Sequence, residues 1–233
     1  MNFTEGCLIC GLELIYFHDT IHFDCFYCGS TFESNVSCPQ NHYVCDQCHS
    51  SNANDLIERY CNKTTSIDPV EIANTLMHNP IIKMHGPEHH YLVPATLITA
   101  YHNLNGKRHK IKHDLRIAKK RAESVLGGFC GTHGNCGAAV GTGIFISVIT
   151  GNTPLADKEW QLSNTMTGKS LLCIAEQGGP RCCKRDSFTA INEAVDFLKE
   201  KFDTELPKPE IICEFSARNK QCKFNDCQFY SKK

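Results

Sequence analysis

Apolar and polar residues recur with helical spacing over much of the chain from about residue 66 onward. Within 66–80, Asp68 is the expected N-cap, Pro69 the expected first helical residue and Pro80 the stop. The apolar pattern then continues to Asn105-Gly106, which is a stop signal. These two segments predict consecutive helices. The loop between them is interpreted as simply polar rather than metal-binding, although it holds three histidines, His85, His89 and His90.

A longer apolar run with small residues follows a glycine-rich loop. The stretch AAVGTGIFISVIT, residues 138–150, lacks alternation and predicts a buried helix whose small-residue face packs tightly against a neighbour. The pair Thr153-Pro154 predicts the start of another helix, which Gly178-Gly179 ends. A last helix is expected to begin at residue 186 or 187. The expected apolar face of the middle helix consists of Leu155, Trp160, Leu162, Met166, Leu171 and Ile174.

One further predicted helix is amphipathic and basic. Between residues 107 and 121 the chain carries eight Lys and Arg residues and a single acid, Asp114. Ile111, Leu115 and Ala122 recur at helical intervals, so one face is apolar and the other basic. A solvated helix face is the simpler interpretation. The functional alternative is a docking surface for RNA or an acidic protein partner, although no aromatic residue lies among these cations to stack on a base.

The first 50 residues are dense in potential metal ligands. Three Cys-x-x-Cys pairs occur, with Cys38, His42 and His49 near them. Each pair forms a tight turn that presents two thiolates, and two such turns complete a tetrahedral zinc site. If the first two turns in the chain share an ion, they form one zinc-ribbon-like site, and the third turn forms a second site with the nearby Cys38 and a histidine. An interleaved pairing of the same residues is the alternative. The predicted ligands are Cys7, Cys10, Cys25, Cys28, Cys38, His42, Cys45 and Cys48.

Composition favours metal binding over disulfides. The chain has 16 cysteines and 12 histidines in 233 residues, and its formal net charge of −1 excludes a strong general attraction to nucleic acid. Residues 1–11 carry neither a basic nor an apolar segment, so no signal peptide is expected. No run of about 18 apolar residues predicts a membrane helix. We therefore expect a cytoplasmic protein without membrane contact, in which thiols bind metal.

Two glycine-rich loops carry the remaining candidate chemistry. Cys130, His133 and Cys136 lie in the first loop. In the second, two adjacent thiols stand beside three cations just ahead of a predicted helix, whose positive end favours thiolate over thiol. Thiolates from both loops could converge on zinc or on an iron–sulfur cluster. The residues of the second loop are Arg181, Cys182, Cys183, Lys184 and Arg185.

The order of motifs through this region resembles the catalytic domain of iron–sulfur L-serine dehydratases and L-cysteine desulfidases. The Cys-rich N-terminus, together with CGAAVGTGIF and GGPRCCKR, is also similar to an uncharacterised prokaryotic family. The segments that carry the first resemblance are CGAAVG at 136–141, GNTP at 151–154, Cys173, GGP at 178–180 and RCCKRDSFTAINEA at 181–194.

This resemblance implies a catalytic cluster. Cys136, Cys173 and either Cys182 or Cys183 would hold a [4Fe–4S] cluster with one iron open as a Lewis acid. Because Cys173 lies in an apolar helical segment, Cys130 is an alternative third ligand. The acidic residue of the family's first motif is absent here, so deamination of serine does not carry over with the cluster.

Three more cysteines lie in the polar C-terminal segment, after a linker with two prolines. Cys213, Cys222 and Cys227 could form a further metal site with an outside ligand such as Cys61, or hold a cluster with one open iron. One of them could instead complete the central cluster as a displaceable fourth ligand, which is what the resemblance implies for the tail.

Together these patterns predict a mainly α fold, in which a small zinc-ribbon-like module precedes a helical cluster-binding domain. The expected boundaries are 1–50 for the zinc module, 60–205 for the helical iron–sulfur domain and 206–233 for the Cys-containing tail.

The expected function is a [4Fe–4S]-dependent lyase or sulfur-transfer (desulfidase) enzyme. Its open iron would bind a small anionic substrate with a hydroxyl or thiol group. His133 is the expected proton-transfer residue, and the expected anion-binding cations are Arg181, Lys184 and Arg185. The alternative is a zinc-binding scaffold that docks RNA or a protein partner without catalysis.

Overall fold

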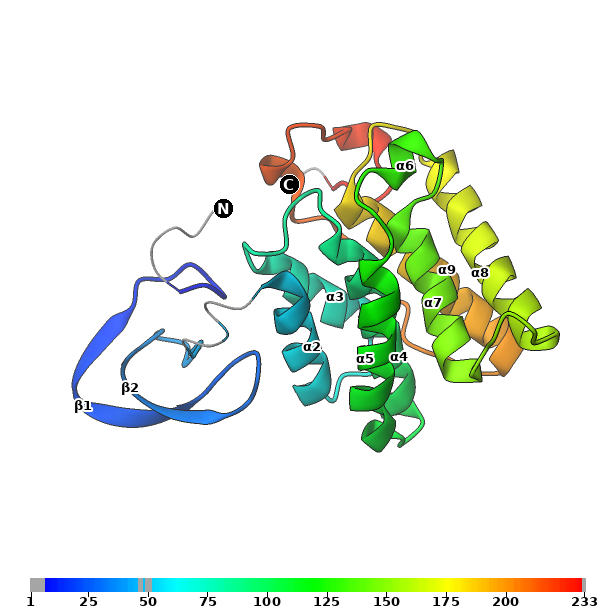
Figure 1. Cartoon of the computed structure of the whole chain (residues 1–233). Helices are drawn as coiled ribbons and strands as arrows, with labels where there is room; N and C mark the ends of the chain where they lie inside the picture. Colours follow the sequence, from blue (N-terminus) through cyan, green and yellow to red (C-terminus); the bar gives the residue numbers. More distant parts are fainter. Residues whose placement is uncertain (1–6, 46–47, 49–51, 232–233) are drawn as a thin grey trace.

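The computed structural model describes residues 7–45, 48 and 52–231, which form a small N-terminal module beside a larger helical domain (Figure 1). The module contains an antiparallel hairpin of β1 (Ile15–Asp24) and β2 (Thr31–Ser37). Its register pairs Asp24 with Thr31 at the turn, and Ile15 with Ser37 at the open end. The two ends of the hairpin therefore lie far apart, and each is adjacent to different cysteines.

The helical domain confirms the predicted mainly α fold. Helix α7 packs between α4 and α8, while α9 contacts α3, α4, α7 and α8. Apolar side chains from these helices form one continuous core. The described helices are α2 (Ala53–Lys63), α3 (Pro69–His78), α4 (Glu88–Leu104), α5 (Ile111–Glu123), α6 (Phe129–Thr132), α7 (Gly137–Thr150), α8 (Lys158–Glu176) and α9 (Cys183–Phe202), with 3₁₀ turns η1 (Arg108–Lys110), η2 (Ser216–Arg218) and η3 (Phe224–Asp226).

Local sequence signals fix several of these elements. Asp68 caps α3 by accepting hydrogen bonds from the backbone N–H groups of Val70 and Glu71, at 2.8 and 3.1 Å, and Pro69 is the first helical residue. Such a cap satisfies N–H groups that have no partner within the helix. Helix α5 buries the predicted apolar face against the core and leaves most of its cations exposed.

Helix α8 differs from its prediction. It begins at Lys158 rather than at Pro154, because Thr153 starts a separate turn. Leu155 is 96% exposed and Trp160 50% exposed, so the predicted apolar face is wrong at its N-terminal end. Helix α8 faces a glycine-containing surface of α7, where small side chains allow close approach. The buried positions of α8 are Ser163, Met166 and Ser170.

Glycines on α7 make this close packing possible, as the sequence predicted. A Cβ atom built on Gly137 would lie 2.0 Å from Cδ2 of His90 on α4. One built on Gly143 would lie 2.0 Å from Oγ1 of Thr167 on α8. Both distances are far shorter than van der Waals contact, so the two glycines set how near α7 comes to its neighbours.

Replacing Gly137 with alanine is therefore expected to destabilise the domain. The added methyl group displaces the His90 ring, and overpacking of this kind costs about 1–3 kcal/mol. Gly168→Ala on α8 is the matched control, because a Cβ there has no neighbour within 4 Å. Thermal unfolding should show a lower midpoint for Gly137→Ala and an unchanged or higher midpoint for Gly168→Ala. Equal unfolding midpoints for the two variants would contradict the close approach of α7 to α4.

The N-terminal module and the C-terminal tail both attach to the helical domain. Asn79 donates a hydrogen bond to the buried Tyr27 hydroxyl at 2.7 Å, and Lys63 Nζ donates to the Phe26 carbonyl at 2.8 Å. The tail returns over α9 and buries Phe215 and Phe229 in the main core. No described helix is long and apolar enough to cross a lipid bilayer.

Candidate metal centres

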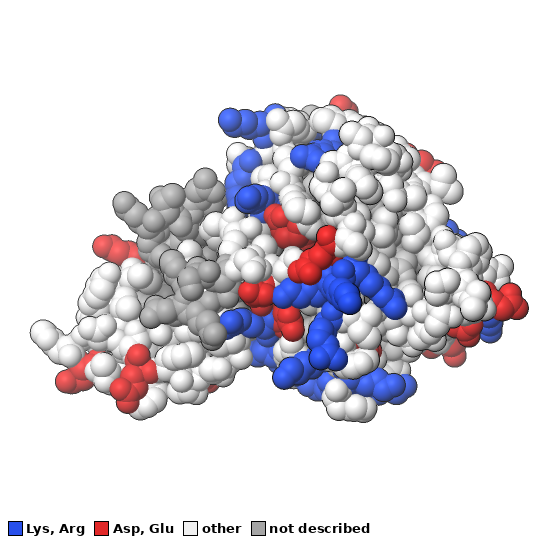
Figure 2. Space-filling view, viewed as in Figure 1, with Lys and Arg blue, Asp and Glu red and all other residues white. Residues whose placement is uncertain are grey.

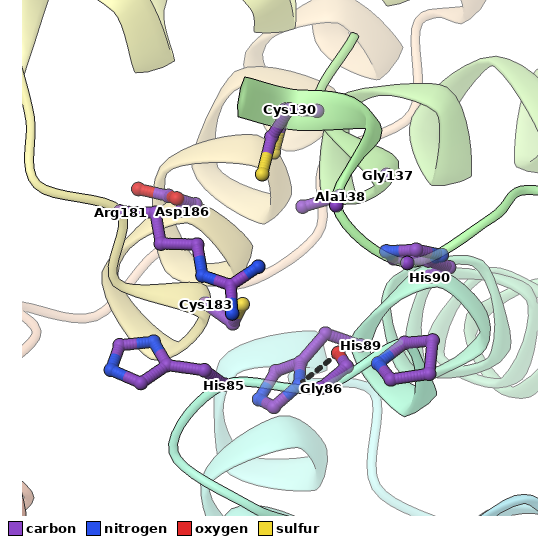
Figure 3. A pocket seen from close by; sticks show the side chains of 14 residues that line it. His85, Gly86, His89, His90, Cys130, Gly137, Ala138, Arg181, Cys183 and Asp186 are labelled. Atoms are coloured by element: carbon purple, nitrogen blue, oxygen red, sulfur yellow. Dashed lines mark hydrogen bonds between the residues drawn. The ribbon is translucent and has the colours of Figure 1, made fainter. Parts of the chain in front are cut away.

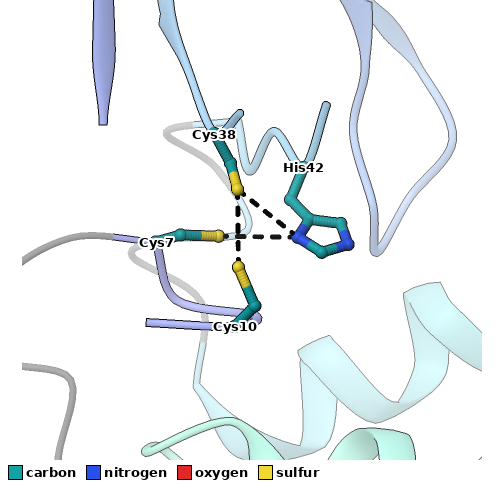
Figure 4. Close-up of side chains that lie close together, drawn as sticks. All are labelled: Cys7, Cys10, Cys38 and His42. Atoms are coloured by element: carbon teal, nitrogen blue, oxygen red, sulfur yellow. Dashed lines mark hydrogen bonds between the residues drawn. The ribbon is translucent and has the colours of Figure 1, made fainter. Parts of the chain in front are cut away.

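The first candidate metal centre lies at the open end of the β1–β2 hairpin. Cys7, Cys10, Cys38 and His42 converge there, and all four ligand atoms lie within 4.8 Å of one another (Figure 4). The Sγ atoms of Cys10 and Cys38 are 3.4 Å apart, and His42 Nδ1 lies 3.8 Å from the Cys7 sulfur. Tetrahedral zinc with bonds of about 2.3 Å holds sulfurs about 3.8 Å apart. This group therefore has the donors and spacing to hold a metal ion such as zinc.

A second candidate centre is built from cysteines alone. Cys25, Cys28, Cys45 and Cys48 also have ligand atoms within 4.8 Å of one another, with 3.9 Å between the sulfurs of Cys28 and Cys45. Three of the four side chains are buried, and Arg59 of α2 approaches the Cys48 sulfur at 3.8 Å. Four closely spaced thiols with a nearby cation favour a bound divalent ion of the same class.

The two groups are interleaved, because the hairpin separates neighbouring turns. The strands pair from Ile15 with Ser37 at one end to Asp24 with Thr31 at the other, and the 7 residues of β2 at about 3.3 Å each give this hairpin a length of roughly 20 Å. Cys10 precedes β1 and Cys25 follows it, so they cannot share one ion. Cys10 instead meets Cys38, since the register brings the start of β1 beside the end of β2. The sequential pairing into a zinc-ribbon-like site is thus replaced by the interleaved one, and His49 lies outside the described residues.

The glycine-rich loops form a third region of interest, a cavity of about 340 Å³ beside the N-termini of α4, α7 and α9. Three thiols line it, from Cys130 in α6, Cys136 at the N-cap of α7 and Cys183 at the first position of α9. Cys130 lies on one side and Cys183 on the other, with the Arg181 side chain beside Cys183 (Figure 3). Both loops therefore meet at one site, as their composition suggested.

Burial controls the charge of these thiols. It raises the pKa of Cys136 to about 11 and that of Cys183 to about 12, and the negative charge of Asp186 adds to both shifts. For Cys182 and Cys183, desolvation outweighs the neighbouring cations that were expected from the sequence to favour the thiolates, so the pKa of each is raised. Asp186 is itself buried and paired with Arg185 at 3.0 Å. A bound cation would favour the thiolate forms of Cys136 and Cys183.

Three histidines, which the sequence reading treated as a polar loop, also line the cavity: His85, His89 and His90. His90 Nδ1 lies 3.0 Å from the Val125 carbonyl. His89 is 1% exposed, and burial holds its pKa well below the usual range, so its ring is neutral. His85 Nδ1 and His89 Nε2 are buried without a hydrogen-bond partner among the described residues. The sequence feature that could have indicated their role is the occurrence of three histidines within six residues.

Several predicted site residues lie elsewhere. His133 is exposed, 2.8 Å from the Thr132 hydroxyl, and does not line the cavity. Lys184 is fully buried and donates to the Met77 and Ile82 carbonyls, and burial lowers its pKa to about 7. Of the three predicted anion-binding cations, Arg181 alone lines the cavity.

The adjacent cysteines at the start of α9 point to different sites. Helix α9 begins at Cys183 rather than at residue 186, and Cys182 is its N-cap. Cys182 lines a small pocket with the three tail cysteines, not the cavity. Cys173 lines neither, since its thiol donates to Glu193 at 3.3 Å between α8 and α9. Cys61 is buried in the core. The geometry thus favours Cys130 over Cys173 at the cavity.

Residues 57–230 match a protein-family model described as "Family of unknown function (DUF5714)", and the chain belongs to this family. The matched range begins within α2 and ends in the tail, so it takes in the helical domain and the tail as one unit and leaves out the N-terminal module. Neither curated proteins nor solved structures gave a match.

Proposed function

We propose that the helical domain is an iron–sulfur enzyme whose [4Fe–4S] cluster is held by Cys130, Cys136 and Cys183. It would act as a lyase or sulfur-transfer enzyme on a small anionic substrate that carries a hydroxyl or thiol. The observation that supports this proposal is the convergence of three thiols, from three separate segments, on one cavity that also contains an arginine. We further propose that both N-terminal groups hold zinc.

The spacing of the thiols favours a cluster over a single ion. Among the described residues, only the two N-terminal groups bring three or more ligand atoms within 4.8 Å of one another. The cavity thiols are therefore more widely spaced than one zinc ion requires. Each thiolate of a [4Fe–4S] cluster binds a different iron, so a wider spacing is expected. When bound, such a cluster would offer one iron without a protein ligand as a Lewis acid.

The residues around the thiols suit an anionic substrate. Arg181 can form paired hydrogen bonds with a carboxylate. His89 Nδ1 lies 3.1 Å from the Gly86 carbonyl, which can only accept, so Nδ1 carries the hydrogen and Nε2 has a free lone pair. His85 Nε2 likewise faces two side-chain oxygens, of Asn219 and Gln221, at 3.2 Å. We assign proton or hydrogen-bond acceptance to these two histidines in place of His133.

Activity should require both the cluster and Arg181. We expect anaerobically prepared protein to release sulfide from small thiol-containing amino acids or water from hydroxy acids. Arg181→Gln should raise KM about 10- to 100-fold with a smaller change in kcat, because a charge-assisted hydrogen bond contributes about 1.5–3 kcal/mol. Arg116→Gln, on the exposed face of α5, is the control. Cluster-loaded protein that turns over none of these substrates would refute the proposed reaction.

The basic surface of α5 supports the second candidate function, docking of RNA or an acidic partner. Three of its cations are used internally: Arg108 by backbone carbonyls, Lys119 by Asp55 and Glu58, and Arg121 by Ser147. A blue surface remains over this part of the molecule (Figure 2). The exposed cations for which the described residues provide no ion pair are Lys107, Lys110, Lys112, Arg116 and Lys120.

Docking at this surface would depend steeply on salt. Each phosphate contact releases counterions, so RNA affinity should fall as salt rises, and changing Lys112, Arg116 and Lys120 to glutamate should abolish it. Fluorescence anisotropy with single-stranded RNA at 50 and 200 mM salt would measure this effect. Equal affinity in the wild type and the triple variant would remove the surface from consideration.

A further inference from the structure

The pocket beside Cys182 brings together four thiols from distant parts of the chain. Cys182 comes from the start of α9, and the other three come from the tail that returns over that helix. Buried aromatic rings of Phe188, Phe215 and Phe229 form part of the same lining. The three tail cysteines that line the pocket are Cys213, Cys222 and Cys227.

The turns that carry these thiols repeat the geometry of the N-terminal centres. The backbone N–H of Phe215 donates to the Cys213 sulfur at 3.4 Å, and that of Phe224 donates to the Cys222 sulfur at 3.4 Å. In the N-terminal module, the residue two positions after Cys7 and the residue two positions after Cys38 donate in the same way, both at 3.4 Å. Such bonds stabilise negative charge on sulfur, as a metal-bound thiolate requires.

A side-chain donor completes the pattern. Asn219, which is buried, donates from Nδ2 to the Cys182 sulfur at 3.5 Å, while its Oδ1 lies 3.2 Å from His85. Four thiols that line one pocket, with three donors directed at sulfur, resemble the surroundings of a metal thiolate more than those of packed, neutral cysteines.

We propose that Cys182, Cys213, Cys222 and Cys227 form a closed four-thiolate metal centre that fastens the tail to α9. Four thiolates are the donor set of both structural zinc and a fully ligated [4Fe–4S] cluster. These sulfurs are not among the groups whose ligand atoms lie within 4.8 Å of one another, so their spacing favours the cluster, and metal analysis distinguishes the two. The tail has no sheet and only short 3₁₀ turns among its described residues, so a metal would supply much of its folding energy. This centre does not depend on the proposed enzymatic function.

The proposal gives the two adjacent cysteines separate roles. Cys183 faces the cavity, whereas Cys182 faces the tail centre. One peptide bond would then join the two metal sites. Loss of the tail centre is expected to leave the cavity thiols in place, because they belong to α6, α7 and α9 and not to the tail.

Metal analysis of anaerobically purified full-length variants tests this centre. Cys222→Ser should lose either one zinc or one cluster of about four irons relative to the wild type, and the lost metal identifies its kind. Cys173→Ser, at a half-buried thiol outside both pockets, should retain all metal. Cys136→Ser should lose the cavity metal and keep the tail metal, so the proposals for the two centres are tested independently. Unchanged metal content in Cys222→Ser would overturn the proposal.

Alkylation of the wild-type protein gives a test that needs no variant to fold. Cys213, Cys222 and Cys227 are only half-buried, so without metal they should react with iodoacetamide. We expect mass spectrometry to show that all four proposed ligands resist alkylation and become reactive together after chelation. The reactivity of Cys173 should not change on chelation. Immediate alkylation of Cys222 and Cys227 in untreated protein would overturn the proposal.

Discussion

Replacing Cys38 with serine is expected to unfold the N-terminal module and to release one metal ion per chain. Cys38 is buried, and its sulfur lies 3.4 Å from that of Cys10 and 3.7 Å from His42 Nδ1. The apolar cluster around the second group is small and consists largely of the cysteines themselves. A module of this size depends on its ions, whose apparent binding free energy is about 10–16 kcal/mol for structural zinc.

The helical domain should survive this change. It has its own continuous core, and the described contacts with the module come from α2 and from Asn79 and Ile81, which follow α3. Circular dichroism should therefore show retained helix, while proteolysis should cleave within residues 7–45. Cys61→Ser is a poor control because that thiol is buried in the core, so Cys173→Ser serves instead. A Cys38→Ser variant with full metal content and an intact module would contradict the assigned ligand set.

Replacing Cys136 with serine is expected to remove the metal of the central cavity. Cys136 caps α7, and its thiol lines the cavity together with those of Cys130 and Cys183. A cluster left with two of three thiolates loses a covalent anchor, and a serine hydroxyl is a poor ligand for iron. Iron, sulfide and the visible absorbance of the anaerobic protein should all fall severalfold, while zinc should not change.

Two comparisons separate this effect from general damage. Cys183→Ser should behave like Cys136→Ser, because both thiols line the same cavity. Cys173→Ser should keep its iron, although the motif order of L-serine dehydratases would make this residue a ligand. Loss of iron in Cys173→Ser with retention in Cys183→Ser would reverse our assignment.

Sequence reasoning named the eight residues of the two N-terminal groups but not how they pair. Any two cysteine turns can complete a tetrahedral site, so spacing alone leaves the pairing open. The deciding feature is strand β1, which separates Cys10 from Cys25 by its full length. That strand has no regular apolar alternation, and most of its side chains are exposed, so its pattern gave no signal.

The position of one helix start explains most of the differences at the central site. The sequence placed the start of α9 at residue 186 or 187, after both cysteines, whereas the helix begins at Cys183. With this earlier start, Lys184 is buried in the core, Cys183 lines the cavity and Cys182 lines the pocket beside the tail. In the first turn of α9, Lys184 donates to the Met77 and Ile82 carbonyls, and local capping preferences do not encode such tertiary contacts.

Helix α7 shows the opposite case. Its uninterrupted apolar run with small residues predicted tight packing against one neighbour, and Gly137 and Gly143 allow close approach to two, α4 and α8. On α8 the predicted face fails only at its N-terminal end, where Leu155 and Trp160 are exposed and Ser163 lies against Gly143 of α7.

The most direct test of the iron–sulfur assignment is to measure iron, sulfide and zinc per chain, together with the visible spectrum, in protein purified without oxygen. The proposed centres predict zinc for the two N-terminal groups and at least about four irons with matching sulfide, which give a broad absorbance near about 400 nm. A colourless protein that contains zinc and no iron would contradict the cluster and leave the basic surface of α5 as the stronger indication of function.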